Sequence, residues 1–286
     1  MKTIPLTATT RGVLLALYVL TAAAVFLYLG FPSEALRAYL GHRLSASLPG
    51  LSVAVGEVRP SLTAGLVLQG VRISHGPKPL AELDQLRIQP DLLSLLQAGT
   101  GYTFSGSLGG GEISGRAEID SAGPTPKASM NARIGGILLQ QVPGLRSLYG
   151  SSLSGRLDGN LSTNEAGALN GKITITDGQV ELAEPLLGQS RFTFRTVDAD
   201  LTLQNRNLLL RNGRIKGNEL DADVSGSIAL DQPQGANALN LSGRVTPHHA
   251  FMARAEGSIP AGLLRRRAGI PFRLSGPLDA PGFSLN

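Results

Sequence analysis

From Leu51 to the end of the chain, apolar and polar residues alternate at every second position over most segments. The clearest segment is 219–230, whose apolar members are Leu220, Ala222, Val224, Ile228 and Leu230. The polar members between them are Asp221, Asp223, Ser225 and Ser227. Because successive side chains of a strand point to opposite faces, the pattern predicts a sheet with one apolar and one polar face. We therefore expect a mainly β fold: a curved, mostly antiparallel sheet with two or three short helices.

A short motif recurs in these strands, in which an apolar residue, Ser, Gly, any residue and a second apolar residue follow one another. The Ser-Gly pairs are Ser105-Gly106, Ser114-Gly115, Ser154-Gly155, Ser225-Gly226, Ser242-Gly243 and Ser275-Gly276. Two related segments carry Asn170-Gly171 and Glu256-Gly257. The spacing between copies is irregular, which excludes a repeat of fixed period.

The glycines of this motif fall on the same face as the flanking apolar residues. A glycine inside a strand weakens the strand, so its presence there needs a reason. One interpretation is that the glycines let the sheet bend sharply. The other is that they leave room on the apolar face for another backbone or for the acyl chains of lipids. The candidate groove residues are then Gly106, Gly115, Gly155, Gly171, Gly226, Gly243, Gly257 and Gly276.

Ahead of the strands, residues 12–31 form an apolar run without a charge. A helix of about 20 residues spans the hydrocarbon core of a bilayer, so this run predicts a transmembrane helix. Only Lys2 and Arg11 carry charges before it, which by the positive-inside rule keeps the N-terminus in the cytoplasm. The alternative is a cleaved signal peptide. Against it, the only Ala-x-Ala segment, Ala22 to Ala24, falls inside the run rather than after it.

The anchor divides the chain into parts on either side of a membrane. Residues 1–11 are predicted to be cytoplasmic, and everything after 12–31 is predicted to lie on the far side. Two prolines near residue 125 and a non-periodic apolar stretch after residue 136 indicate a crossover at 121–150. This crossover is predicted to separate two halves of the β domain, 32–120 and 151–286.

Between the anchor and the sheet, residues 33–47 carry Leu36, Leu40 and Leu44 at a spacing of four. This spacing predicts an amphipathic helix. The helix would either cover the end of the sheet or lie on the membrane surface.

Three local signals predict details of the sheet. The apolar residues of 65–74 change phase at Gln69-Gly70, and those of 191–203 change phase at Arg195-Thr196, so we expect a β-bulge at each place. Pro277 cannot donate a backbone hydrogen bond, which favours an edge position for the last strand.

Composition and motifs exclude several classes of function. The chain has no Cys, and so no disulfide or thiol chemistry. Its net charge of +5 fits anionic headgroups, an acidic partner or ordinary solubility, and we expect no nucleic-acid partner because no platform of aromatic and basic residues is present. Arg265, Arg266 and Arg267 form the densest basic cluster, a candidate contact with headgroups or a partner.

No catalytic or metal-binding motif is recognisable in the chain. His248 and His249 are adjacent, and adjacent strand residues point to opposite faces, so the pair is a poor chelate. We therefore expect neither an enzyme nor a bound cofactor or metal.

The order of segments resembles a known family. After the apolar run come FPSEALRAYL, GLVLQGVRIS and LRIQPDLLSLLQAG; the chain continues with GYTFSGSLGGGEISG and ends with PFRLSGPLDAPGFSLN. In this order the chain resembles the type II secretion system protein N family, in its deltaproteobacterial form. More distantly, it is similar to the AsmA-like proteins of Gram-negative envelopes. The resemblance covers nearly the whole chain.

The resemblance implies a single-pass inner-membrane protein with a periplasmic β-rich domain. It implies a non-enzymatic role in the machinery that exports folded proteins across the outer membrane, with the inner membrane and other type II secretion proteins as partners. It supplies no catalytic residues. The AsmA-like similarity implies a different function, the binding or transfer of lipids between the two membranes, for which a curved sheet with an apolar groove is expected.

Overall fold

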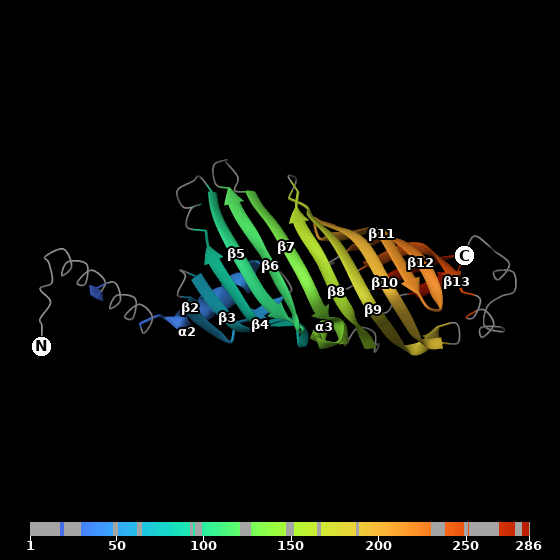
Figure 1. The fold of residues 1–286 in the computed structure, drawn as a ribbon, viewed down its shortest axis with the longest axis horizontal. Helices are drawn as coiled ribbons and strands as arrows, with labels where there is room; N and C mark the ends of the chain where they lie inside the picture. The colour runs from blue at the N-terminus through green and yellow to red at the C-terminus, as the bar shows by residue number, and fades with distance from the viewer. Residues whose placement is uncertain are drawn as a thin grey trace, which may run out of the picture.

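The computed structural model describes residues 18–19, 30–47, 51–61, 65–91, 94, 99–120, 127–146, 152–164, 167–186, 189–229, 238–248, 251, 269–277 and 282–285. These residues form one 15-stranded antiparallel sheet with few helices, as the alternating pattern predicts (Figure 1). The strands of the N-terminal part are β1 (Ser52–Ala54), β2 (Glu57–Ser61), β3 (Gly65–His75), β4 (Lys78–Pro90), β5 (Gly99–Leu108), β6 (Gly111–Asp120), β7 (Lys127–Leu138) and β8 (Ser152–Thr163). Those that follow are β9 (Leu169–Leu186), β10 (Gln189–Gln204), β11 (Asn207–Gly217), β12 (Leu220–Ala229), β13 (Ala238–Pro247), β14 (Ile270–Pro277) and β15 (Gly282–Leu285).

The sheet is a meander. From β3 onward each strand pairs with the strand before it and the strand after it, and β1 and β2 both pair with β3. Figure 1 shows the strands side by side in chain order along the long axis of the molecule. The two ends of this order do not pair with each other, so the sheet is open rather than closed.

A helix covers the N-terminal end of the sheet. Helix α2 (Ser33–Ser47) has the predicted bounds, and it packs Leu36 and Leu40 against a buried cluster that includes Val58 and Leu68. Of the two predicted positions, the structure therefore has the helix on the sheet. The third leucine of the predicted stripe, Leu44, is exposed, because four-residue steps drift around a helix of 3.6 residues per turn.

The apolar pattern changes face near Gly70, as predicted, but not through a bulge of β3 alone. Leu68 and Val71 both lie in the buried cluster, although a regular strand would place them on opposite faces. Gly70 between them has a φ of +61°. On β4, Leu83 and Leu86 both pack on the same cluster, and the register between β3 and β4 does not shift here. The change of face is thus a kink that the two strands share.

The predicted crossover at 121–150 contains a full strand. Strand β7 pairs with β6 on one side and with β8 on the other, so the sheet continues through this region. The non-periodic stretch after it forms the 3₁₀ helix η2 (Leu139–Gln141) and the short helix α3 (Pro143–Arg146). Helix α3 lies against β4, where the backbone of Gly144 approaches that of Leu80.

Two further local predictions have different outcomes. The bulge at Arg195-Thr196 is confirmed by a register shift between β10 and β11. The edge position predicted for the strand that carries Pro277 is wrong, since β15 pairs with β14 and forms the edge itself. Pro277 avoids a missing hydrogen bond by lying beyond the last residue of β14 that pairs with β15.

The predicted transmembrane helix falls on residues that lie almost entirely outside the described part of the chain. Among the residues that the structure does describe, no helix has both the length and the apolar character that a membrane span needs.

Most of the sheet is a single layer. The helices of the described part pack on β1, β2, β4 and β8. On the apolar face of the strands that follow, side chains such as Leu157, Ile173, Val197 and Leu201 are only half-buried. An apolar face of this kind is stable in water only if it is covered or if the sheet folds over on itself.

Candidate functional site

The C-terminal part of the sheet encloses an apolar cavity of about 230 Å³. Every described residue that lines it is apolar. From β9 to β12 these residues are Val180, Phe192, Phe194, Ile215, Leu220, Ala222 and Val224. From β13 to β15 they are Val245, Pro247, Ile270, Phe272, Phe283 and Leu285. We call this space the apolar cavity.

The strand register places these side chains on one face. Ile215 pairs with Ala222, which pairs with Val245, and Val245 pairs with Ile270, so one row of apolar residues crosses four strands. Directly paired residues share a face of the sheet. The apolar face predicted for residues 219–230 is therefore confirmed at Leu220, Ala222 and Val224, which form a wall of the cavity.

The cavity requires the sheet to curl. Strands β9 and β15 are six steps apart in the sheet order. At about 4.8 Å per step, a flat sheet would separate them by roughly 29 Å. Val180 of β9 and Leu285 of β15 nevertheless line the same small cavity. The curved sheet expected from the sequence is thus present at this end.

Aromatic side chains occupy much of the cavity's border. The rings of Phe272 and Phe283 stack with centroids 5.8 Å apart. Phe251, which follows β13, is fully buried, and its ring lies 6.4 Å from that of Phe192 on β10. Since β10 and β13 are three steps apart in the sheet, this contact joins the two sides of the curl.

A polar cluster lies beside these aromatic residues at the end of β13. The His248 amide donates to the Glu219 carbonyl oxygen at 2.9 Å, and the Thr193 amide donates to a Glu219 carboxylate oxygen at 3.1 Å. Glu219 therefore links the end of β13 to β10 through the turn between β11 and β12. The cluster holds together the strands whose apolar faces form the cavity.

The His248 ring lies between two acceptors. Its Nδ1 is 3.0 Å from the Asn218 carbonyl oxygen, and its Nε2 is 3.2 Å from Oδ2 of Asp221. A neutral imidazole donates one hydrogen bond, whereas the protonated ring donates both. The hydrogen bond to the Asn218 backbone and then the one to Asp221 raise the pKa of His248 above its ordinary value.

Of the eight candidate groove glycines, the seven that the structure describes do not line the apolar cavity. At three of them a neighbouring side chain lies where a Cβ would stand: the Phe104 ring at Gly115, a methyl group of Leu161 at Gly171 and the Phe272 ring at Gly243. A Cβ on Gly243 would also collide with the Asp223 carbonyl oxygen of the adjacent strand. Protein atoms, rather than open space for a ligand, therefore lie next to these three glycines.

The remaining candidate residues from the sequence are one glycine, one histidine and the arginine cluster. Gly257, His249 and the cluster Arg265, Arg266 and Arg267 lie outside the described residues. Among the residues that the structure describes, no three His, Asp or Glu side chains gather closely enough to hold a metal ion.

The cavity itself was not predicted residue by residue, although a signal for it was present. The chain has eight phenylalanines, of which Phe192, Phe194, Phe272 and Phe283 line the cavity and Phe251 packs beside it. Their concentration after residue 190 indicates an aromatic cluster. Their distance along the chain conceals that cluster until the strands are paired.

Comparisons of the chain with models of protein families, with characterised proteins and with solved structures found no match.

Proposed function

We propose that this protein binds the acyl chains of lipids on the apolar face of its curled sheet. The observation that supports this proposal is the apolar cavity, whose described lining consists of apolar side chains from seven consecutive strands. Apolar cavities exclude water and accept apolar ligands, and one of about 150 Å³ is enough for a small hydrocarbon. Among the described residues, no charged group belongs to the lining, so the geometry favours binding rather than chemistry.

The size of the cavity limits what it holds. At about 230 Å³ it is smaller than the pockets of roughly 300–1,000 Å³ that enclose whole drug-sized ligands. It therefore takes one part of an acyl chain. The half-buried apolar face that carries Ile175, Val197 and Leu201 provides a surface for the rest of that chain.

The test is a binding assay with a fluorescent fatty acid, cis-parinaric acid, on the purified full-length protein. Ala222 is buried in the wall of the cavity, and Ala222→Phe fills the space without adding charge. We expect this variant to bind the probe at least about tenfold more weakly, since a ring replaces the ligand's apolar contacts. Ile119→Phe enlarges an exposed residue on β6 and serves as the control.

Both variants need an unfolding midpoint close to that of the parent protein for the comparison to hold. Equal binding by Ala222→Phe and the parent would contradict the proposal, as would the absence of any binding by the parent. Extraction of lipid from protein purified out of membranes, followed by mass spectrometry, identifies the natural ligand.

Location and a role in protein export remain predictions from the sequence. Protease added to spheroplasts is expected to digest the part after residue 31 and to leave the N-terminal leader protected. A deletion strain that releases its exoproteins normally would count against the export role, and that result would leave lipid binding unaffected.

A further inference from the structure

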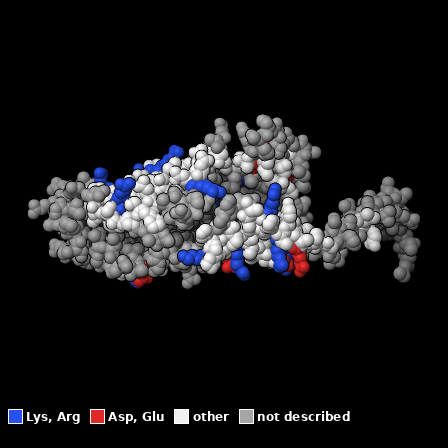
Figure 2. All heavy atoms as spheres, turned by 180° about the vertical axis from the view of Figure 1, so that it is seen from behind, with Lys and Arg blue, Asp and Glu red and all other residues white. Residues whose placement is uncertain are grey.

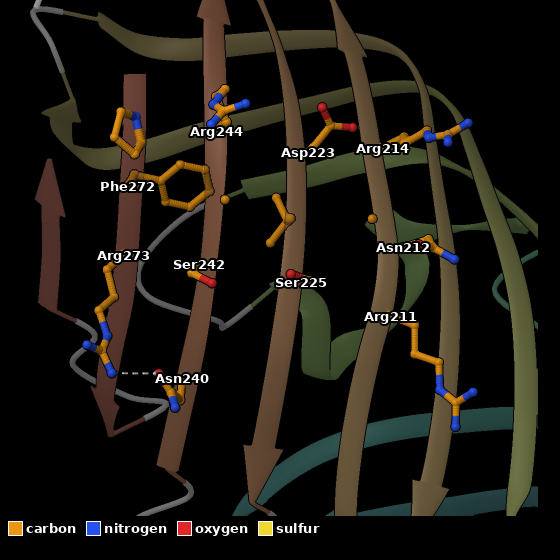
Figure 3. Close-up of a pocket in the computed structure, with 14 residues that line it drawn as sticks. Arg211, Asn212, Arg214, Asp223, Ser225, Asn240, Ser242, Arg244, Phe272 and Arg273 are labelled. Carbon is orange, nitrogen blue, oxygen red and sulfur yellow. Dashed lines mark hydrogen bonds between the residues drawn. The ribbon is translucent and has the colours of Figure 1, made fainter. Parts of the chain in front are cut away.

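The polar face of the same C-terminal strands carries a second hollow, of about 750 Å³. Figure 3 shows Arg244, Asp223 and Arg214 in one row across β13, β12 and β11. The neighbouring row holds Arg273, Ser242 and Ser225, with Asn212 and Arg211 next to it on β11. Four arginines and a single acid, Asp223, thus surround the hollow.

This hollow is one part of a longer groove. A hollow of about 430 Å³ adjoins it and shares Arg211 and Asn212 in its lining. A third, of about 440 Å³, shares Asn160 and Ser162 with the second. We call the three together the polar groove.

The groove follows a cross-strand row that is interrupted by one register shift, between β11 and β12. The paired residues from β7 to β11 are Arg133, Asn160, Lys172, Asp200 and Asn212. Ser225, Ser242 and Arg273 continue it on β12 to β14. Seven steps of about 4.8 Å give the row a length of roughly 34 Å. An extended chain, rather than a compact small molecule, fits this shape.

Several arginines elsewhere in the sheet, although not all, have ion-pair partners that the groove arginines lack. Arg59, Arg72 and Arg191 each form an ion pair with a glutamate within 3.3 Å. Among the described residues, neither Arg211 nor Arg244 forms an ion pair, and Arg273 donates a hydrogen bond of 3.2 Å to the side-chain oxygen of Asn240. Arg211, Arg244 and Arg273 are all exposed. They are therefore available to an anionic ligand.

We propose that the polar groove binds an acidic polysaccharide. Arginine pairs with carboxylates in a bidentate geometry, and the Ser and Asn side chains between the arginines donate to and accept from hydroxyl groups. A chain of sugars that carry both hydroxyls and carboxylates offers partners to the arginines and to the Ser and Asn side chains. This inference is independent of the proposed lipid binding, which uses the opposite face of the same strands.

Other ligands fit the groove less well. Single-stranded nucleic acid needs aromatic side chains on which bases stack, and the one aromatic residue at the groove, Phe272, stacks with Phe283 in the apolar cavity. An extended peptide binds by pairing with a free sheet edge, whereas the strands beneath the groove are already paired on both sides. On the face that Figure 2 shows, the described basic side chains stand apart from one another rather than in the dense patch that an anionic membrane attracts.

The test is affinity electrophoresis of the full-length protein in detergent, with polygalacturonate in the gel as probe and neutral dextran as control. Polygalacturonate should retard the protein, and added salt should weaken the effect. The double variant Arg211→Gln/Arg273→Gln is expected to bind about tenfold more weakly, because two charge-assisted contacts are lost. The matched control Arg72→Gln/Arg191→Gln removes the same charge from ion pairs outside the groove.

A second pair of variants removes negative instead of positive charge. Asp223→Asn removes the acid from the C-terminal hollow and should strengthen binding about twofold, whereas Glu82→Gln, which removes an equal charge on β4, should not. Ala222→Phe should leave polysaccharide binding unchanged, which separates this proposal from lipid binding.

Three results would overturn the inference. One is an equal loss in both double variants, which would mean that net charge alone is responsible. The second is no retardation by polygalacturonate. The third is tighter binding to vesicles of phosphatidylglycerol or to an oligonucleotide than to polygalacturonate.

Discussion

Gly243 and Phe272 face each other on β13 and β14, and the contact shows what a glycine does in this sheet. The Phe272 ring lies over the glycine, with its Cε1 atom 2.8 Å from the place of a Cβ. An aromatic ring over a cross-strand glycine fills the space that the missing side chain leaves. Gly243 and Phe272 therefore pack together as a small residue and a large one on neighbouring strands.

Gly243→Ala is accordingly expected to destabilise the fold by about 1–3 kcal/mol, because the added methyl group meets both the ring and the Asp223 carbonyl. Gly135→Ala is the matched control, since nothing lies within 4 Å of the Cβ that it adds. Urea denaturation of the two variants measures the difference. Equal midpoints would show that the sheet relaxes around Gly243.

His248 is a titratable residue near the cavity, and its ring contacts Asn218 and Asp221. Its pKa is raised in the folded state, so its contribution to stability is complete below the ordinary value of 6.5. That contribution is lost as the pH rises through the raised folded value. We expect the denaturation midpoint to fall over this window, and His248→Gln to remove this part of the pH dependence. His42→Gln, on an exposed face of α2, should keep it.

Helix α2 was predictable as an element because its signals are local. Pro32 precedes it, the leucines repeat at helical spacing and Pro49 follows it. Its contacts with the sheet are tertiary: the Ser45 hydroxyl accepts a hydrogen bond of 2.9 Å from the Val53 amide, and Gly41 lies against the Val53 carbonyl. Neither contact follows from the spacing of leucines.

Replacing Leu36 and Leu40 together with alanine should cost roughly 2 kcal/mol, since both are partly buried against the N-terminal cluster. Leu44→Ala should cost little, because Leu44 is exposed. Amide hydrogen exchange provides the measurement, with faster exchange expected in β1 and β2 of the double variant only. Equal effects of the double variant and of Leu44→Ala would contradict the packing described here.

At the scale of the whole molecule, the sheet runs without a break across residue 150, so the two predicted halves of the β domain share one sheet. Strands β7 and β8 pair on either side of the boundary at residue 150, so a cut there exposes a new edge of β8 along the 12 residues of that strand. Long exposed edges recruit other strands.

The fragment of residues 151–286 is therefore expected to self-associate, whereas the full-length protein does not do so through this edge. Light scattering coupled to size-exclusion chromatography distinguishes the two outcomes. A monomeric fragment with a cooperative unfolding transition would show that the C-terminal half is a domain of its own.

Features set by a few neighbouring residues were predictable from the sequence. They include the alternation of residues 219–230, the bounds of α2 and the bulge at Arg195-Thr196. Each depends on side-chain period or on backbone freedom, which are local properties. The glycine motif was visible in the sequence. The packing around its glycines was not predictable, because the atoms next to Gly243 belong to other strands.

The sequence by itself determined that this chain forms a two-faced antiparallel sheet, because alternation leaves no other way to bury its apolar side chains. Only the tertiary structure decided how far the sheet curls, since curvature sums small rotations over many strand pairs that no single segment encodes. That curl brings Val180 and Leu285 to one cavity. The strand register, also a tertiary property, aligns Arg133, Lys172 and Arg273 along one groove on the other face.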